Sequence, residues 1–352
     1  MPRNDVGPRV WRPARPGCLL GSPLSRYFLR RLGSSLLLLF LVLSFTFVFV
    51  RLAPGGPEAL YLDPRISAEQ RELIEKRLGL DKPLVEQYGT WLLAALRGDF
   101  GTSFTAQRPA FDVILEKLPA TALLALTATA IEHGIGLFLG VVAARRAGQP
   151  VDHGIRTLSL VLFSVPAFWL ALLAVQLLAV QWALFPPSQM TSSGAASMSW
   201  WGRQIDLLHH LALPALVLGL ARCGAVVRFC RNGLLETLGQ DFVRTARAKG
   251  LTENQVLWRH ALPNALVPLI QRFGLALPIM LSGSLVIEVI FSWPGVGNAS
   301  FVAILQRDYP VILASTAVNA TLVILGSLLA DLLHAGLDPR VRLADASGEG
   351  AP

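Results

Sequence analysis

Long apolar runs alternate along this chain with short polar connections. About 20 consecutive apolar residues in helical conformation cross the hydrocarbon core of a bilayer. The pattern predicts six membrane-spanning helices, over residues 33–52, 119–144, 158–185, 211–227, 266–291 and 311–333. The fourth is the least continuous, because Arg222 and Arg228 interrupt its end. The expected fold class is therefore an all-α integral membrane protein.

Composition supports this fold class. The chain has 352 residues, of which 53% are hydrophobic and 15% are charged, whereas a soluble domain carries roughly 25% charged residues. Cys18, Cys223 and Cys230 form neither a C-x-x-C pair nor a metal-ligand spacing, so we expect isolated thiols and no metal site. The first apolar run lacks a small-residue cleavage site and follows a long tail, which favours a membrane helix over a cleaved signal.

The distribution of arginine and lysine predicts the orientation. Short flanks rich in these residues stay in the cytoplasm. The basic flanks are the N-terminal tail, the connection between spans two and three, the connection between spans four and five, and the segment after span six; their residues include Arg26, Arg30, Arg31, Arg145, Arg146, Arg156, Arg231, Arg244, Arg247, Lys249, Arg259, Arg340 and Arg342. They share one side if both termini are cytoplasmic.

The segment after span one, where acidic residues balance the basic ones, then lies outside the cell. Ser67-Ala-Glu-Gln70 has the pattern of a capping box that opens a helix ending near Gly79. A second helix is predicted after Pro83, with an apolar stripe that includes Tyr88 and Trp91 and a stop at Gly98. A third amphipathic stretch, 111–118, continues into span two. This folded segment could brace the membrane domain or offer a docking surface to an external protein.

These features divide the chain into five regions. They are a basic cytoplasmic tail (1–32), the first transmembrane helix (33–52), an external helical segment (53–118), a transmembrane core (119–335) containing a cytoplasmic loop (236–263), and a second cytoplasmic tail (336–352).

The cytoplasmic loop is predicted to be a helical hairpin. Residues 242–249 have helical propensity, and Gly250 suits the left-handed position that follows a helix. Thr252-Glu-Asn-Gln255 then forms a second capping-box pattern, and Pro263 precedes span five. By itself the hairpin could be a binding site for another protein or a basic loop that attracts anionic lipid.

The hairpin sequence resembles the EAA loop of permease subunits in binding-protein-dependent ATP-binding-cassette importers. That pattern is Glu-Ala-Ala, three residues, Gly, nine residues, then Ile-x-Leu-Pro. Anchored on Gly250, the chain matches at Ala246 and at Leu262-Pro263 but has Arg244, Thr245 and His260 at the other positions. The stretch Gln240-Asp-Phe-Val-Arg-Thr-Ala-Arg-Ala-Lys-Gly250 is similar to the loop of the peptide and nickel branch.

Other segments resemble the dipeptide/oligopeptide B-type permease of the same branch, and they follow one another from about residue 30 to residue 342. They are Leu78-Gly-Leu-Asp-Lys-Pro83, Arg97-Gly-Asp-Phe-Gly-Thr-Ser103, Ser164-Val-Pro-Ala-Phe-Trp169, Phe291-Ser-Trp-Pro-Gly-Val-Gly297, Arg307-Asp-Tyr-Pro310 and Leu337-Asp-Pro-Arg340.

The resemblance implies a peptide permease subunit of a bacterial inner-membrane importer, with import of nickel or another small solute as the alternative. Expected partners are a second, similar permease, two ATPase subunits, an external solute-binding protein and membrane lipid, but no nucleic acid. The chain has no Gly-Lys-Ser/Thr phosphate loop. The resemblance thus implies that this subunit is not itself an enzyme and binds no cofactor, while ATP and magnesium bind the partner ATPases.

The same resemblance implies that the ATPase subunits bind the hairpin in a surface cleft. The residues assigned to this coupling are Asp241, Arg244, Thr245, Ala246, Arg247, Ala248, Lys249, Gly250 and Pro263. Arg244, Arg247 and Lys249 would supply charge complementarity. Ala246 and Gly250 would permit close approach of the partner.

Candidate path residues lie in span five. Gln271 and Arg272 could line a wet cavity, or Arg272 could extend to the cytoplasmic headgroups. Glu288 is either a gate group that meets a substrate amine or a partner for the backbone near Ser292 and Gly295. Ser282 and Ser284 could contact substrate, although with the intervening glycine they also suit a helix–helix contact.

Two other sequence features suggest helix packing. Gly136-x-x-x-Gly140 in span two fits a close contact with a neighbouring helix. His209 and His210 point to different faces of a helix, so an interfacial pair is favoured over a metal site.

A stand-alone channel or secondary transporter, or an intramembrane hydrolase, would be the functions from other classes. The sequence pattern predicts neither the inverted repeats nor the paired intramembrane charges of a secondary transporter. Asp331 is the only aspartate in a predicted span, and Glu132-His133 lacks a second histidine for a hydrolase motif.

Overall fold

A computed structural model describes residues 23–52, 82–266 and 284–337, with side chains described between residues 30 and 329. Throughout these ranges the regular structure is helical, apart from one isolated bridge between Thr102 and Pro109. The predicted all-α class is confirmed. The capping box predicted at Ser67–Gln70 lies outside the described residues.

Four long helices are apolar enough to cross a membrane: α1 (Pro23–Leu52), α5 (Leu118–Arg145), α8 (Trp200–Leu238) and α14 (Tyr309–Leu337). Counting one bent pair of helices as a span raises the number to five within the described ranges. They match predicted spans one, two, four and six. Most of predicted span five lies outside the described residues, and α12 (Leu285–Ile290) is its described end.

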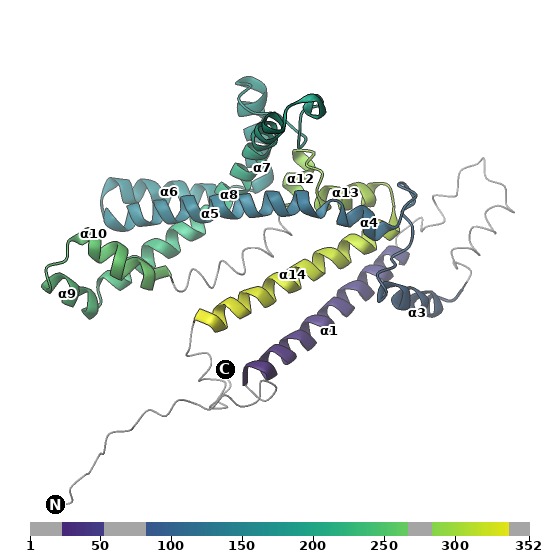
Figure 1. Cartoon of the computed structure of the whole chain (residues 1–352), viewed down its shortest axis with the longest axis horizontal. Coiled ribbons are helices and arrows are strands. Elements are labelled where there is room, and N and C mark those ends of the chain that lie inside the picture. Colours follow the sequence, from purple (N-terminus) through teal and green to yellow (C-terminus); the bar gives the residue numbers. More distant parts are fainter. Residues whose placement is uncertain (1–22, 53–81, 267–283, 338–352) are drawn as a thin grey trace, which may run out of the picture.

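The region predicted as span three is not the continuous helix expected over residues 158–185. It comprises α6 (Pro150–Ser164), then α7 (Ala167–Ala174) with the π-helix η3 (Val175–Gln181), bent by 100° between them. Val165 has extended backbone (φ −82°, ψ 131°) at the break. The cause is Pro166, because proline lacks an N–H and disfavours helical backbone in the preceding residue. In Figure 1, α7 stands away from the line of α5 and α6.

Helix α8 is longer than predicted span four at both ends. Its start is fixed by Ser199, whose Oγ accepts a hydrogen bond from the Gly202 N–H (3.2 Å). This is a regular N-cap. At its other end the helix continues past Arg228 and stops before Gly239, with Pro214 accommodated inside it. The polar residues that interrupt the apolar run therefore do not end the helix.

Helices α5 and α8 pack closely and run parallel to each other. A Cβ built at Gly136 would lie 2.6 Å from the Val226 Cβ, and one at Gly140 would lie 2.6 Å from the Cys230 Cβ. The contact positions increase together along both helices, from 136 to 140 in α5 and from 226 to 230 in α8, so the helices are parallel. A four-residue step keeps both contacts on one face of each helix. The predicted role of the Gly136-x-x-x-Gly140 pair in helix packing is confirmed. Because α5 and α8 point in the same direction, the chain must run back from the end of α5 at Arg145 to the start of α8 at Trp200. This return segment contains α6, α7 and η3.

Helix α6 packs antiparallel to α8. Asp152 near the start of α6 meets Arg231 near the end of α8. Further along α6, a Cβ at Gly224 of α8 would collide with the Ser159 backbone oxygen. Helices α5, α6 and α8 thus form one bundle.

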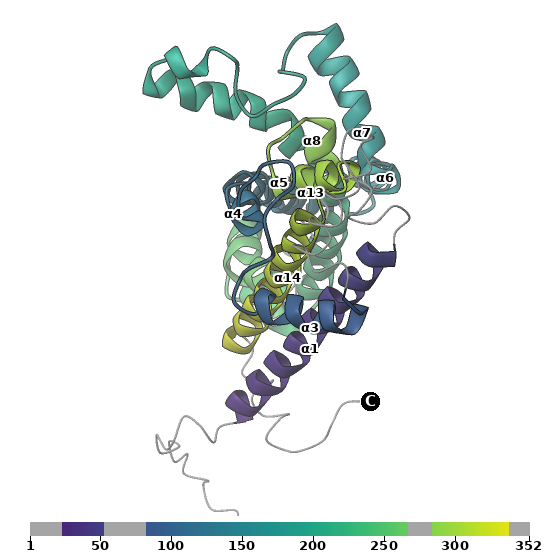
Figure 2. The same cartoon turned by 90° about the vertical axis from the view of Figure 1, so that its right-hand side faces the viewer.

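A second group comprises α1, α14, α13 (Val296–Leu305) and the short helices α3 (Leu84–Ala95) and α4 (Ala110–Leu115). Phe47 and Val50 of α1 share a cavity with Tyr309 of α14, whereas Leu38 shares one with Asn319. Helices α1 and α14 are therefore antiparallel, as Figures 1 and 2 show. The start of α1 and the end of α14 lie toward the same end of the molecule.

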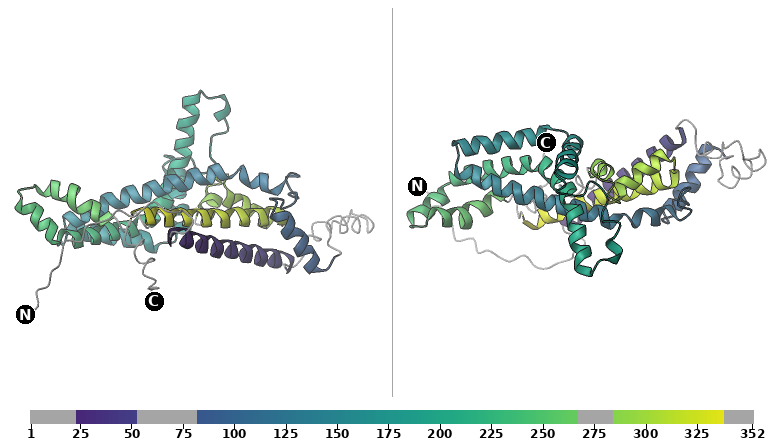
Figure 3. Two further views of the ribbon diagram at one scale, coloured as in Figure 1. Left: turned by 60° about the horizontal axis from the view of Figure 1, so that its bottom comes forward. Right: turned by 90° about the horizontal axis from the view of Figure 1, so that it is seen from above.

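The described part of the external segment packs on α1 and α14. The rings of Phe47 and Trp91 have centroids 4.9 Å apart, and Ser44 Oγ lies 2.6 Å from Tyr88 Oη. The predicted helix after Pro83 is confirmed, although it ends at Ala95 rather than at Gly98. Ser103 and Thr105 both hydrogen-bond the buried Asp308 carboxylate just before α14. Figure 3 shows α3 and α4 gathered at one end of the long helices.

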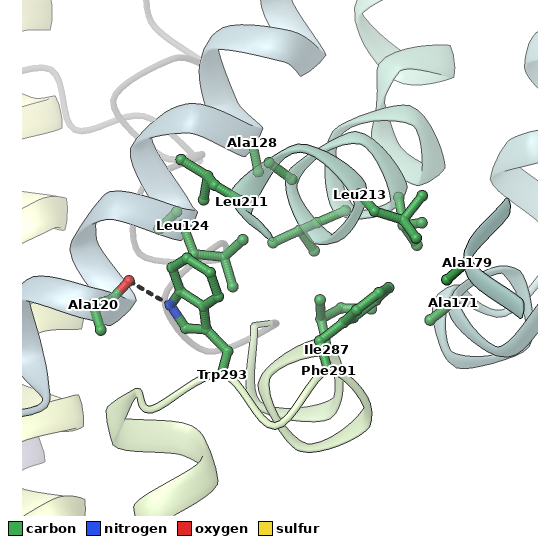
Figure 4. Packing of buried hydrophobic residues seen from close by; sticks show 14 residues of the cluster. Ala120, Leu124, Ala128, Ala171, Ala179, Leu211, Leu213, Ile287, Phe291 and Trp293 are labelled. Carbon is green, nitrogen blue, oxygen red and sulfur yellow. Dashed lines mark hydrogen bonds between the residues drawn. The ribbon is translucent and has the colours of Figure 1, made fainter. Parts of the chain in front are cut away.

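The two groups meet at that same end. Trp293, fully buried, donates its indole N–H to the Ala120 carbonyl (2.8 Å). Figure 4 shows this bond beside Leu124 and Leu211, with Ile287 and Phe291 on the α12 side. A buried indole N–H needs a partner, and the start of α5 supplies it.

Candidate functional site

The cytoplasmic hairpin predicted from the sequence forms as α9 (Asp241–Ala248), α10 (Glu253–Gln255) and the π-helix η5 (Val256–Ala261). Gly250 has φ +82° directly after α9, the left-handed conformation expected of it. Thr252 and Gln255 form the predicted capping box, with Thr252 N–H to Gln255 Oε1 at 2.9 Å. Two local features, the left-handed Gly250 and the capping box, therefore define the turn of the hairpin.

The π-helix is a feature that the sequence analysis did not predict. It ends two residues before Pro263, which is exposed. Proline provides no N–H for the turn before it, and short π-helical segments accommodate such defects in the hydrogen-bond ladder. Pro263 therefore explains the widened turn.

The inner face of α9 is formed by Val243 and Ala246, which are buried against Val256. This changes the expectation for Ala246, because its methyl group packs within the hairpin and is not presented to a partner. The small exposed residues on this helix and its turn are Ala248 and Gly250. Ala246 instead sets how closely α9 approaches η5.

The outer face of α9 is strongly polar. Asp241, Arg244, Thr245, Arg247 and Lys249 are all exposed. Arg244 Nη1 lies 3.3 Å from Asp241 Oδ1, with side chains that are 73% and 95% exposed, so this pair adds little stability. A face with this exposure and charge suits contact with another molecule.

Arg247 has a different role from Arg244. Its Nε donates to Glu253 Oε1 (2.8 Å) and its Nη2 to Glu253 Oε2 (3.2 Å), a bidentate pair that bridges the Gly250 turn. The hydrogen bonds from Arg247 lower the pKa of Glu253 below its ordinary value. Arg247 therefore closes the hairpin as well as contributing charge to its outer face.

The hairpin is seated on the ends of α5 and α8. Leu257 and Ala261 of η5 are buried with Val141 of α5 and Leu234 of α8. Arg145 Nη2 also donates to Asn254 Oδ1 (3.0 Å). In Figure 1, α9 and α10 lie at the end of α5 opposite to α4 and α13.

A second candidate site surrounds Glu288, which is fully buried. Its Oε1 accepts from Thr121 Oγ1 (2.9 Å) and Ser284 Oγ (2.9 Å), and its Oε2 accepts from the Asn298 N–H (3.0 Å). A Cβ at Gly295 would collide with the same carboxylate. Of the two roles considered for Glu288, this geometry favours the partner for nearby backbone.

Of the other four residues predicted to line the path, only Ser284 lies within the described residues. Gln271, Arg272 and Ser282 lie outside the described residues. Ser284 is buried, and its hydroxyl binds Glu288 within the same turn of chain. Their assignment to the path remains a prediction.

The histidines of α8 bind different groups. His209 Nε2 lies 2.9 Å from the Leu184 carbonyl, and His210 Nδ1 lies 2.8 Å from the Asp206 carbonyl. His210 thus bonds within α8, whereas His209 reaches the segment that follows η3, and the two rings serve different contacts.

A charged pair between two long helices was not predicted from the sequence. Arg222 Nε of α8 lies 3.9 Å from Glu132 Oε2 of α5, so the expectation of no paired intramembrane charges is wrong. Only the parallel register of the two helices brings positions 132 and 222 together. A signal was present in the sequence: one acid in span two and one base in span four, both costly in a membrane unless paired.

Comparison with known proteins identifies the family. The model of the binding-protein-dependent transport system inner membrane component matches residues 136–343, and the N-terminal model for such membrane components matches residues 24–125. The oligopeptide transport system permease protein AppB of Bacillus subtilis (strain 168) is 40% identical over 319 residues, covering 90% of this chain and 99% of the relative. The dipeptide transport system permease protein DppB of Escherichia coli (strain K12) is 36% identical over 334 residues, covering 90% and 98%.

A solved structure supports the fold. One chain of an amino acid ABC transporter crystallised with histidines is similar with a TM-score of 0.50 and 16% identity, covering 64% of this chain and 94% of that one. At this identity the likeness concerns the fold alone. On the family match, this chain belongs to the binding-protein-dependent transport system inner membrane components, and it is a multi-pass permease component of the bacterial inner membrane.

Proposed function

We propose that this chain is one of two permease subunits in an ATP-driven importer of di- and oligopeptides. It forms half of the path across the membrane, together with a second, similar permease. An external solute-binding protein delivers the peptide, and two ATPase subunits bind the cytoplasmic side. The observation that carries the proposal is the end-to-end match to relatives named as oligopeptide and dipeptide permeases.

The arrangement of the helices supports the proposed orientation. Helices α5 and α8 run in parallel, and the start of α1 and the end of α14 lie toward one end of the molecule. The hairpin α9–η5 lies at the far end of α5 and α8 from α4 and α13. With six spans and both termini in the cytoplasm, the basic flanks face inward as the distribution of Lys and Arg requires.

The outer face of α9 is the proposed contact for the ATPase subunits. Its exposed residues Arg244, Thr245, Lys249 and Gly250 would meet a cleft of complementary charge. The Gly250 turn, the capping box and the Arg247–Glu253 pair support this role, since a flexible loop would absorb a displacement rather than transmit it. ATP-driven closure of the ATPase pair would then move the attached helices as rigid bodies.

Nickel or another small solute remains the alternative cargo, because the same branch includes such importers. The family match and the hairpin geometry are the same for both cargoes. The names of the relatives support peptides.

Uptake by the reconstituted complex tests the proposal. The complex is purified through this chain together with the subunits that co-purify with it, and it is placed in liposomes with the binding protein and ATP. We expect ATP-dependent uptake of radiolabelled trialanine that is lost when any one subunit is omitted. Uptake by this chain alone, or saturable uptake of ⁶³Ni²⁺ with none of peptide, would overturn it.

A further inference from the structure

One buried ion pair at the hairpin end of the bundle has no role in the function proposed so far. Arg231 Nε and Nη2 each lie 2.7 Å from one oxygen of Asp152, so the contact is bidentate. The Asp152 side chain is 1% exposed and that of Arg231 is 15% exposed. Asp152 also accepts the Gly148 N–H (2.9 Å), which fixes the turn between α5 and α6.

The Asp152–Arg231 pair joins α6 to α8 beside the hairpin. The hairpin packs on α5 and α8 through Leu257 and Ala261. Helix α6 packs on α8 and α5, and its charged anchor to α8 is the contact of Asp152 with Arg231. Arg231 directly follows Cys230, which contacts α5, and lies ten residues before α9 starts at Asp241.

From this geometry we infer that Asp152 and Arg231 are positioning residues that make α6 follow α8 when the cytoplasmic hairpin is displaced. The inference rests on the proposed function, because it needs the hairpin to be moved by ATPase subunits. A bidentate arginine–carboxylate contact resists sliding and rotation, since two parallel hydrogen bonds fix both direction and distance. A single apolar contact at this point would not fix the register of α6 against α8 in the same way.

Elsewhere in the α6–α8 interface, Gly224 faces the Ser159 backbone, and this close contact sets the spacing of the two helices. The guanidinium of Arg228 lies 5.0 Å from the Phe163 ring centroid, at an exposed site where such a contact is weak. The directional polar contact of this interface is therefore the bidentate ion pair at the Asp152 end, next to the hairpin.

The test separates a mechanical role from a purely structural one. Removing one partner leaves an uncompensated buried charge and would destabilise the protein. The double variant Asp152→Asn/Arg231→Gln removes both charges, and replacing both members of a buried pair is much less damaging than removing one. The matched control, Lys82→Gln/Glu86→Gln, removes an exposed pair at the other end of the molecule.

Distances measured by pulsed electron paramagnetic resonance give a readout that needs no knowledge of the cargo. Spin labels are placed on α6 (Val151→Cys), on α8 (Glu236→Cys) and on α1 (Leu36→Cys), all exposed positions. The complete complex is measured with and without ATP plus vanadate. In the otherwise unchanged complex, we expect both the 36–151 and the 36–236 distances to change.

In the double variant we expect the 36–236 distance still to change, while the 36–151 distance no longer follows it. Peptide imported per ATP hydrolysed should fall about tenfold, within the range of about 5- to 150-fold typical of coupling between sites. The control variant should behave like the parent. Equal changes of both distances in the double variant would overturn the inference and leave the proposed function intact. If neither distance changes in the parent, the proposed role of the hairpin fails, and the inference fails with it.

Discussion

Val226 of α8 occupies the space that a side chain at Gly136 of α5 would need, with 2.6 Å between the Val226 Cβ and a Cβ built at position 136. The same relationship recurs one turn later between Cys230 and Gly140. These contacts set the parallel register of α5 and α8. That register in turn brings Glu132 opposite Arg222 and leaves the ends of both helices together as a seat for the hairpin.

Replacing Gly136 with alanine should therefore destabilise the bundle. The added methyl group must displace Val226, and such overpacking costs about 1–3 kcal/mol. Gly134→Ala is the matched control, because it lies on the same helix with open space around it. There alanine should be neutral or stabilising by about 0.5–1 kcal/mol, since glycine disfavours helix. The melting temperatures of both variants in detergent test this; a Gly136→Ala variant as stable as the parent would contradict the packing.

Substitution of Glu288 should loosen the junction between the two groups of helices. In Glu288→Gln one carboxylate oxygen becomes an N–H₂ donor. If the amide oxygen keeps the Asn298 N–H, the N–H₂ faces the Thr121 and Ser284 hydroxyls, whose O–H groups then lose their acceptor. A buried donor left without a partner costs about 1–3 kcal/mol. We expect a clearly lower melting temperature, whereas Glu86→Gln on the surface should have little effect. An unchanged melting temperature would show that these hydrogen bonds do not hold the junction.

Changes in the hairpin should impair transport without preventing insertion. Gly250→Pro cannot keep φ at +82°, because proline is fixed near −65°. Arg244→Glu places a second acid beside Asp241 on the outer face. We expect uptake to fall at least about tenfold in both variants, by analogy with coupling free energies of 1–3 kcal/mol, with normal amounts in the membrane fraction. Gly154→Ala, at an open helical position, is the control; full uptake in Gly250→Pro would argue against coupling through this turn.

The Arg247–Glu253 pair predicts a small dependence of stability on pH. The arginine lowers the pKa of Glu253 in the folded protein, so the pair stabilises the fold fully above the ordinary glutamate value of 4.5. The contribution is lost as the pH falls from that value through the lowered pKa. The melting-temperature difference between the parent and Glu253→Gln should be modest at pH 7, because the pair is exposed, and should vanish in acid. A difference that persists in acid would mean that the pair is not its source.

Sequence alone determined the features that depend on local backbone preference and on apolar length. The hairpin is the clearest case: Gly250, Thr252 and Gln255 specify a left-handed stop and a capping box whatever the rest of the chain does. The long apolar runs likewise specify membrane helices, because a buried backbone must satisfy its hydrogen bonds internally. The spacing of Gly136 and Gly140 indicated a packing face, although not its partner.

Tertiary structure decided which faces meet. Nothing local to Ala246 shows that its methyl group turns inward against Val256, and no spacing relates Glu132 to Arg222 or Asp152 to Arg231. Those pairs arise because α5 and α8 pack in parallel while α6 reverses beside them. The bend at Pro166 was visible as a proline in the sequence, but its 100° angle was not. Helix formation depends on contacts a few residues apart, whereas register depends on side chains that meet across the membrane domain.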